Sequence, residues 1–283
     1  MKKLTERLLM FVIGVPIALS IILFLPQRNH LVANVIIIIL SALGAVEFAD
    51  FLKRKNILIS MKEAAVLGAT APIAMTLIVS FNFSTEFLFF VFIFGAGWLV
   101  VSCIFVNEEL LKSTINRVSA GFAVMMYPGL FMMWIIKMNH LLHAKMLILT
   151  FLLIVFATDS AAWAFGMLFG KGNRGIILAS PNKSIVGFIG GLFVAIIIGL
   201  IMVFVLPDVF ASSKIASPLA GVVLAFLVAV AAILGDLGES AMKRSSDIKD
   251  SGNIIPGRGG VLDSIDSLSF AAPIYYIFYK ILF

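Results

Sequence analysis

The sequence has almost none of the residues from which proteins build disulfides and thiolate metal sites. Cys103 is the single cysteine among 283 residues, and there are only three histidines. An internal disulfide is therefore impossible, and a metal site made of several thiolates is excluded. Charged residues are also scarce, at 13% of the chain against 61% hydrophobic residues. Soluble globular domains do not have this composition, which is typical of membrane proteins.

Apolar runs long enough to cross a bilayer recur along the whole chain. A transmembrane helix needs about 20 predominantly apolar residues. We therefore predict an all-α fold, a polytopic integral membrane helical bundle with about nine transmembrane helices. The helices are expected at residues 8–26, 31–52, 63–81, 87–106, 118–136, 144–170, 185–206, 218–243 and 265–283.

The chain also lacks a linker, an internal repeat and a low-complexity tract. Residues 1–283 are therefore predicted to form a single membrane domain. In it, residues 1–143 would be scaffold, and residues 144–283 would carry the functional residues. Glycines four residues apart, Gly166 with Gly170 and Gly187 with Gly191, are expected to let helices pack closely.

Lysine and arginine are concentrated in every second segment between the predicted helices. If the N-terminus is cytoplasmic, most of the 21 basic residues lie on the cytoplasmic side. The positive-inside rule then favours an N-in, C-out orientation. The net charge of +6 needs no nucleic acid to explain it, because no aromatic-basic motif accompanies it. The polar stretch 249–266, KDSGNIIPGRGGVLDSID, joins the last two helices on this cytoplasmic side.

Polar and ionisable side chains interrupt three of the predicted helices. Such groups cost about 2.5–3.5 kcal/mol each at the centre of a membrane on insertion scales, so they normally face a cavity or one another. They are Asp159 in one helix, Asp236, Glu239, Ser240 and Lys243 on one stripe of another, and Asp263 and Asp266 at the start of the last. Carboxylates at two adjoining helix ends can converge, which predicts an oxygen-ligand site for a divalent cation such as Mg²⁺.

Glycines and basic residues in the same region are suited to binding phosphate. Residues 251–260, SGNIIPGRGG, can aim backbone N–H groups at an anion around Arg258, although they are no Walker A loop. A second basic loop, ASPNKSIVGFIGG, offers Ser180, Asn182, Lys183 and Ser184. Carboxylates for Mg²⁺ beside cations for phosphate oxygens are the parts that phosphoryl or nucleotidyl transfer requires.

Together these motifs resemble the phosphatidate cytidylyltransferase (CDP-diacylglycerol synthase) family. Its signature runs S-x-x-K-R, four residues, K-D, five residues, P-G-H-G-G-x-x-D-R-x-D. The matching residues are Ser240, Lys243, Arg244, Lys249, Asp250, Pro256, Gly257, Gly259, Gly260, Asp263 and Asp266. The blocks GDLGES, ATDSAAWAFGMLFGK and SPNKSIVGFIGG resemble further family blocks, so the similarity covers about residues 155–270.

Four positions depart from the family pattern. Arg258 replaces a usual His and Ser264 a usual Arg, while Asn182 and Val186 replace a usual Lys and Glu. Arg258 keeps a positive charge but cannot exchange a proton near neutral pH. This departure would matter only if the reaction needed a base at that position.

The resemblance implies a nucleotidyltransferase that converts CTP and phosphatidate into CDP-diacylglycerol and pyrophosphate for phospholipid biosynthesis. It implies one or two Mg²⁺ ions, with a monovalent ion as a further candidate. CTP, phosphatidate and membrane lipids would be its partners, a homodimer is one candidate assembly, and nucleic acid is not expected. The protein would be integral to the bacterial cytoplasmic (inner) membrane, with its active site facing the cytoplasm.

The resemblance also implies roles for individual residues. Asp236 and Asp263 would hold the metal, with Glu239 and Asp266 as further ligands if two ions bind. The residues implied in catalysis are Asp236, Asp263, Lys249, Asp250, Lys243 and Arg258. The residues implied in substrate binding are Asp159, Ser180, Lys183, Ser240, Arg244, Gly259 and Gly260.

Two other functions stay open. A CTP-dependent polyprenol or phytol kinase would share the Mg²⁺ and the nucleotide site, but its acceptor is an alcohol, which needs a general base. A cation-coupled transporter would also explain Asp159 and Asp236 inside membrane spans. It would not explain the dense acid, base and glycine loop.

Three acidic residues are expected to have structural roles only. Glu47 and Asp50 lie close to the basic residues 53–55, so pairing at the end of their helix is expected for both. Asp247 is expected to pair with a neighbouring lysine. None of the three is a predicted site residue.

Overall fold

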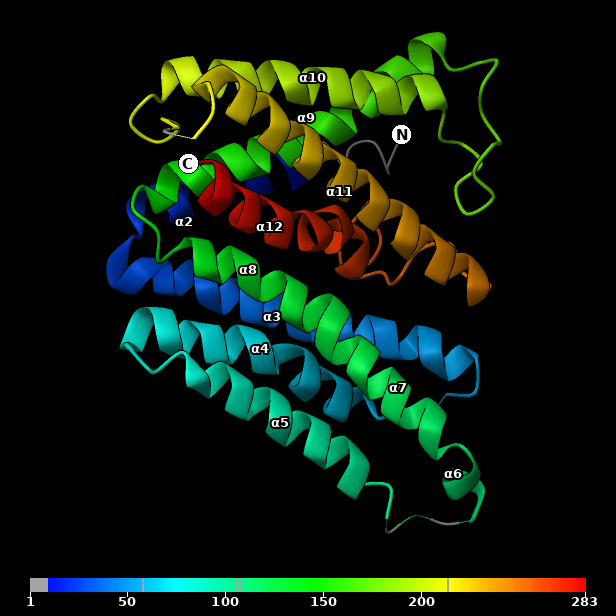
Figure 1. Cartoon of the computed structure of the whole chain (residues 1–283). Coiled ribbons are helices and arrows are strands. Elements are labelled where there is room, and N and C mark those ends of the chain that lie inside the picture. The colour runs from blue at the N-terminus through cyan, green and yellow to red at the C-terminus, as the bar shows by residue number, and fades with distance from the viewer. Residues whose placement is uncertain (1–9, 58, 105, 107, 213) are drawn as a thin grey trace. The chain divides into compact units, whose positions relative to one another are not determined.

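The structure is a computed structural model that describes residues 10–57, 59–104, 106, 108–212 and 214–283 (Figure 1). The described residues form helices joined by loops. Within these ranges there is no β-strand, and the β contacts are two isolated bridges, Arg174 with Ser184 and Ile255 with Gly259. The predicted all-α helical bundle is therefore confirmed. The start of the predicted helix 8–26 lies outside the described residues.

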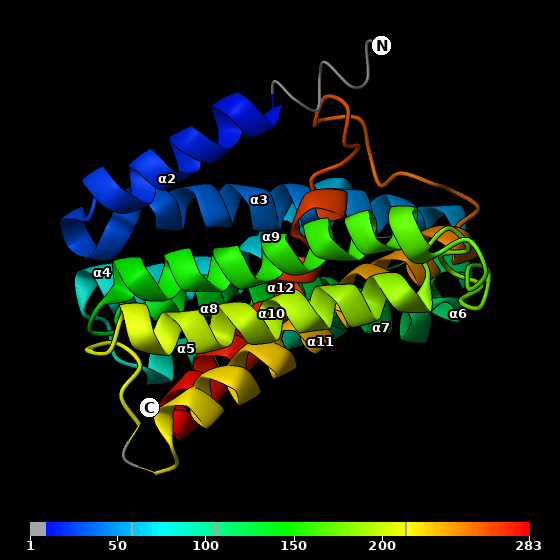
Figure 2. The same cartoon turned by 90° about the horizontal axis from the view of Figure 1, so that it is seen from above.

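Each predicted segment coincides with a helix or with a run of consecutive helices (Figures 1 and 2). They are η1 (Met10–Gly14), α2 (Val15–Phe24), α3 (Gln27–Arg54), α4 (Met61–Phe81), α5 (Glu86–Val101), α6 (Glu108–Lys112), α7 (Thr114–Val124), η2 (Met125–Leu130), α8 (Phe131–Met138), α9 (Ala144–Phe169), α10 (Ile185–Val205), α11 (Ser217–Ser245) and α12 (Leu262–Leu282). In α3, Arg28, Asn29 and His30 have left-handed backbone angles, so its regular part begins where the sequence predicts a helix.

Among the residues that the structure describes, six helical segments are long and apolar enough to cross a membrane by length and composition. They are Gln27–Arg54, Met61–Phe81, Thr114–Met138, Ala144–Phe169, Ile185–Val205 and Ser217–Ser245. Val12–Phe24 and Glu86–Val101 are shorter apolar helices. The chain is thus an integral membrane protein. The number of nine spans and the N-in orientation stay predictions.

The chain folds into two compact units. The first contains the residues up to His140 together with Ser245–Ile265, and the second contains Leu141–Arg244 together with Asp266–Phe283. The loop that precedes α12, and the first turn of that helix, therefore belong to the same unit as α3. The single membrane domain with a scaffold in residues 1–143 stays a prediction.

In the first unit, α4 packs against α3, α5, η2 and α8. Glycines allow these helices to approach closely: a Cβ on Gly68 would collide with Ala45, and one on Gly129 would lie 3.0 Å from the carbonyl oxygen of Gly68. Another glycine of α3, Gly44, admits the start of α12, because a Cβ there would lie 3.1 Å from Cδ1 of Ile265. The buried face of α3 thus meets the end of the polar loop.

In the second unit, the predicted glycines form the contact between α9 and α10. A Cβ on Gly187 would lie 2.5 Å from the carbonyl oxygen of Ala162, and one on Gly191 would lie 2.8 Å from that of Thr158. A Cβ on Gly170 would lie 2.7 Å from Oγ of Ser184. The predicted packing role of these glycines is confirmed.

Replacing Gly191 with alanine is expected to destabilise the protein, because the added methyl group needs space that the backbone of α9 fills. Overpacking of this kind costs about 1–3 kcal/mol. The thermal unfolding midpoint of the detergent-solubilised protein measures the effect. Gly97→Ala is the matched control, since a Cβ on Gly97 of α5 would have no neighbour within 4 Å. Equal midpoints for the two variants would contradict the packing role.

Helix α12 continues in the second unit from Asp266, where it packs against α9 and α11. Its Tyr275 hydroxyl lies 2.6 Å from Oγ1 of Thr150 on α9. On α11, a Cβ on Gly235 would lie 2.6 Å from the carbonyl oxygen of Asp266 and 2.8 Å from Cβ of Phe270. The close approach at Gly235 brings the polar stripe of α11 near the first residues of α12 in this unit.

Candidate active site

A cavity of about 510 Å³ in the second unit gathers four predicted site residues from three separate segments. Asp159 comes from α9, Ser180 and Lys183 come from the loop before α10, and Asp236 comes from α11. The apolar part of its wall is formed by Trp163, Met167, Phe188 and Ile233, among others. The structure therefore brings together residues that the sequence separates by up to about 80 positions.

Lys183 and Asp236 form an ion pair at this cavity. Their side chains are 27% and 30% exposed, so the two charges neutralise one another while both stay accessible to a ligand. The hydroxyl of Ser240, one turn later on α11, lies 3.5 Å from Oδ1 of Asp236. A phosphate oxygen could replace Asp236 as the partner of the Lys183 ammonium group.

The loop between α9 and α10 is fixed by its own hydrogen bonds. The guanidinium of Arg174 donates to the carbonyl oxygen of Gly166 at 2.8 Å, and Ser184 caps α10 by accepting the N–H of Gly187 at 3.1 Å. Arg174 also lines the cavity. It was not among the predicted site residues, although a basic residue in the same loop as Lys183 could have indicated it.

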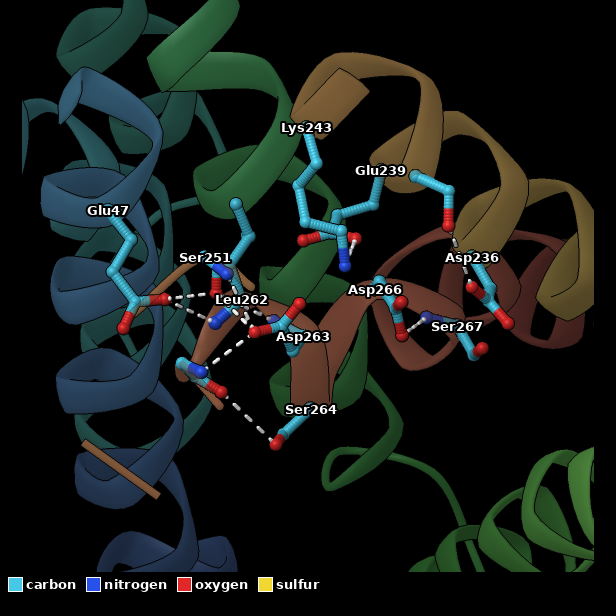
Figure 3. Close-up of polar contacts among 12 residues, drawn as sticks. Glu47, Asp236, Glu239, Lys243, Ser251, Leu262, Asp263, Ser264, Asp266 and Ser267 are labelled. Atoms are coloured by element: carbon cyan, nitrogen blue, oxygen red, sulfur yellow. Dashed lines mark hydrogen bonds and ion pairs between the residues drawn. The ribbon is translucent and has the colours of Figure 1, made fainter. Parts of the chain in front are cut away.

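Further along α11, the polar stripe is buried. Glu239 has no exposed surface and forms an ion pair with Lys243 one turn later (Figure 3). Asp266 is 7% exposed and interacts electrostatically with Asp236, Asp159 and Lys243. Within the described residues, no three His, Cys, Asp or Glu side chains are close enough to hold a metal ion as they stand. The predicted metal ligation stays a prediction.

In the first unit, Asp263 is held by the loop that precedes it (Figure 3). Its Oδ2 accepts hydrogen bonds from the N–H of Ser251 at 2.8 Å, the hydroxyl of Ser251 at 2.9 Å and the N–H of Gly260 at 2.8 Å. Three donors to one oxygen fix the orientation of the carboxylate. Asp263 is thus a pre-oriented anion in the first turn of α12.

The glycine-rich segment forms a tight turn. The N–H of Ile255 donates to the carbonyl oxygen of Gly259 at 2.8 Å, and the N–H of Gly259 donates back at 3.0 Å. Gly257 and Gly259 have φ angles of 74° and 119°, which favour glycine. The N–H groups of Gly259 and Gly260 are therefore engaged within the protein. Their predicted contribution to substrate binding stays a prediction.

Four predicted site residues that precede this turn in the sequence or lie in it are charged and exposed: Arg244, Lys249, Asp250 and Arg258. The side chains of Lys249, Asp250 and Arg258 form no hydrogen bond or ion pair with any residue in the described part of the chain. Their charges are available to a ligand. Their predicted roles stay predictions.

Of the three acids expected to have structural roles, Glu47 does not form the predicted pair at the end of its helix. Asp50 pairs with Arg54 at 2.9 Å, as expected, and Asp247 pairs with Lys55 at 3.2 Å, a lysine that is distant in sequence. Glu47 does not pair at the end of α3. It is buried and accepts hydrogen bonds from the polar loop and the start of α12, because it lies on the face of α3 that packs there.

Comparison with known proteins agrees with the resemblance. The model of the cytidylyltransferase family matches residues 5–282. The chain belongs to the cytidylyltransferase family. The predicted family is thereby confirmed, and the enzyme class of this family, nucleotidyltransferase, is the one that the sequence predicts.

Curated relatives of this cytidylyltransferase carry the name phosphatidate cytidylyltransferase. The protein from Staphylococcus saprophyticus is 35% identical over 170 residues, which cover 59% of this chain and 62% of that protein. The protein from Staphylococcus aureus is 40% identical over 171 residues, with the same coverage. The protein from Haemophilus influenzae is 39% identical over 138 residues, 48% of this chain and 46% of that protein. The chain thus matches less than two thirds of the length of these relatives.

Proposed function

We propose that this cytidylyltransferase transfers the cytidylyl group of CTP to phosphatidate, giving CDP-diacylglycerol and pyrophosphate. The names of the curated relatives support this reaction. The structural observation that carries it is the single cavity that Asp159, Ser180, Lys183 and Asp236 line together. Its wall combines cationic groups with apolar side chains, which suits a phosphate joined to lipid tails.

The chemistry requires two anions to react. A phosphate oxygen of phosphatidate attacks the α-phosphorus of CTP, and the bond from that phosphorus to the oxygen bridging the β-phosphorus breaks. Pyrophosphate leaves with the electron pair. Because the second pKa of a phosphate monoester is about 6, the nucleophile is already ionised and no residue has to remove a proton. Arg258 in place of the usual His is compatible with this reaction.

The residues present fit a divalent cation by their chemistry. The proposed ligands are all carboxylates, which hard cations such as Mg²⁺ prefer, and Asp266 repels both Asp236 and Asp159 electrostatically. Asp236 and Asp263 are the proposed ligands, with Glu239 and Asp266 as further ones. When bound, the ion would screen the phosphates from one another and stabilise the leaving pyrophosphate.

The basic residues would neutralise the remaining phosphate charge. Lys183 would exchange its ion pair with Asp236 for a phosphate oxygen, and Arg174 would contribute a second cation at the same cavity. The exposed Lys249 and Arg258, with Lys243, would bind the polyphosphate of CTP. Such fixed charges act by positioning the reactants and stabilising the transition state.

The proposed location follows from the substrates. The diacyl tails of phosphatidate stay in the lipid, while CTP comes from water. We therefore place the protein in the bacterial cytoplasmic membrane, N-in and C-out, with the active site facing the cytoplasm. A homodimer and a monovalent ion remain part of the proposal as candidates.

Labelled CTP distinguishes the proposed reaction from its alternatives. With purified protein, phosphatidate and Mg²⁺, tritium in the cytidine and ³²P at the α-position are expected in the lipid extract, and ³²P at the γ-position in pyrophosphate. EDTA should stop the incorporation. A polyprenol or phytol kinase would instead transfer only the γ-label to an added prenol. A transporter would label no lipid, and either result would refute the proposed function.

A further inference from the structure

Glu47 is a buried carboxylate that has no cationic partner in the described part of the chain. It lies on α3 and is only 6% exposed. A buried carboxylate is costly unless hydrogen bonds satisfy its oxygens. The donors to Glu47 therefore explain why a charged residue occupies this buried position.

Two of these donors are backbone N–H groups at the start of helix α12. Oε1 of Glu47 accepts the N–H of Val261 at 2.9 Å, and Oε2 accepts the N–H of Leu262 at 2.8 Å. The first N–H groups of a helix have no partner within it, and they carry the partial positive charge of the helix N-terminus. Glu47 thus caps α12 from a helix more than 200 residues earlier in the chain.

Two glycines make room for this contact. A Cβ on Gly252 would lie 2.5 Å from Oε1 of Glu47, and one on Gly260 would collide with both Ser251 and the Glu47 carboxylate. Any side chain at either position would displace the carboxylate from the backbone. Gly260, which the sequence assigns to substrate binding, therefore has a structural reason to be glycine.

The hydroxyl of Ser251 connects Glu47 to Asp263 (Figure 3). Its Oγ lies 2.9 Å from Oε2 of Glu47 and 2.9 Å from Oδ2 of Asp263. Because a hydroxyl has one hydrogen to donate, the two carboxylates share it. The remaining donors to Asp263, the N–H groups of Ser251 and Gly260, belong to the same segments that contact Glu47. The position of the Asp263 carboxylate is therefore set by residues that Glu47 holds.

We propose that Glu47 is a positioning residue for the transfer reaction. By holding the N-terminus of α12 and the hydroxyl of Ser251, it keeps the Asp263 carboxylate in the orientation that binds the divalent cation. The proposal rests on the proposed function, in which Asp263 is a metal ligand. Glu47 acts through Asp263, as residues that orient a metal ligand do, and the loss of such a residue typically costs about 10–100-fold in metal affinity or activity.

The test is Glu47→Gln in the full-length protein. Glutamine keeps the shape of glutamate, but its NH₂ group would face one of the two backbone N–H groups. An NH₂ group cannot accept a hydrogen bond, so that contact is lost. We expect kcat to fall about 10–100-fold and the Mg²⁺ concentration for half-maximal activity to rise. The KM values for CTP and phosphatidate should stay within about twofold, because the Glu47 side chain is buried and its oxygens are engaged by protein donors. Ser251→Ala, which removes only the shared hydroxyl, should also lower kcat and raise the Mg²⁺ concentration for half-maximal activity. This variant replaces Glu47→Gln in the test if Glu47→Gln does not fold.

A second readout needs no substrates. Mg²⁺ that binds the folded state raises the thermal unfolding midpoint, and this rise should be smaller in Glu47→Gln than in wild type. Asp50→Asn is the matched control, one turn later on α3, where Asp50 pairs with Arg54. The control should behave as wild type in every measurement.

The outcomes separate the two proposals. If Glu47→Gln and Ser251→Ala keep the wild-type kcat, Mg²⁺ requirement and midpoint shift, and only the midpoint without Mg²⁺ falls, Glu47 is structural and the inference is overturned. If wild type makes no CDP-diacylglycerol, but Mg²⁺ shifts its midpoint more than that of Glu47→Gln, the proposed reaction fails, while the role of Glu47 in orienting Asp263 for the divalent cation stands.

Discussion

Asp263→Asn is expected to lower kcat by about 10³-fold, at the upper end of the range for losing one group that stabilises transition-state charge. The substitution removes the negative charge of a proposed metal ligand. It can leave the loop in place, because the amide oxygen can still accept the hydrogen bonds that Ser251 and Gly260 donate to Oδ2. Purified protein in mixed micelles, assayed with CTP and phosphatidate over a range of Mg²⁺ concentrations, gives the measurement.

The matched control is Asp247→Asn, the same chemical change in the same loop. The Asp247 side chain is 89% exposed and pairs with Lys55, so activity should stay within about twofold of wild type because exposed ion pairs contribute little. Thermal midpoints of both variants would show whether the fold is kept. Near-normal activity of a folded Asp263→Asn protein would refute the assignment of Asp263 as a metal ligand.

The helices could be predicted because a membrane imposes a length and a composition on them. Each apolar run in the sequence corresponds to a helix, and even the start of the regular part of α3 is found where the apolar run begins. The glycines of α9 and α10 were informative for the same reason, since only residues without a side chain allow two backbones to approach closely. The number of nine spans is predicted from the apolar runs and the N-in orientation from the distribution of charge, and both stay predictions because they depend on the membrane itself.

Residues of the candidate site could be predicted from the sequence only where the type of side chain determines the chemistry that it can perform. Asp159, Ser180, Lys183 and Asp236 were chosen for charge and for resemblance, and they line one cavity. Glu47 could not be found in this way, because its partners are backbone N–H groups that any residue type provides. Local sequence suggested a helix-end pair for Glu47 and could not show that its face of α3 meets the start of α12. The glycine-rich loop can be interpreted in two ways for a related reason: glycine can free a backbone for a ligand or make room for another residue, as it does at Gly260.

Substitutions in the ion pair between Lys183 and Asp236 are expected to have the second large effect on kcat. Asp236→Asn and Lys183→Gln are each expected to lower kcat by about 10²–10³-fold, because each removes a charge that would meet the transition state. The two positions lie on separate segments, so neither local pattern predicts that they pair. The double variant, Asp236→Asn with Lys183→Gln, then tests what the pair is for.

If the pair served stability only, each single variant would leave one partly buried charge without its partner, and the double variant would recover. If Asp236 binds the cation and Lys183 binds a phosphate, the kcat of the double variant should not exceed that of the less active single variant. The exposed pair Glu108 and Lys112, changed to glutamine singly and together, is the control and should leave kcat unchanged. Recovery of activity in the Asp236 and Lys183 double variant would therefore reject a direct role for both residues.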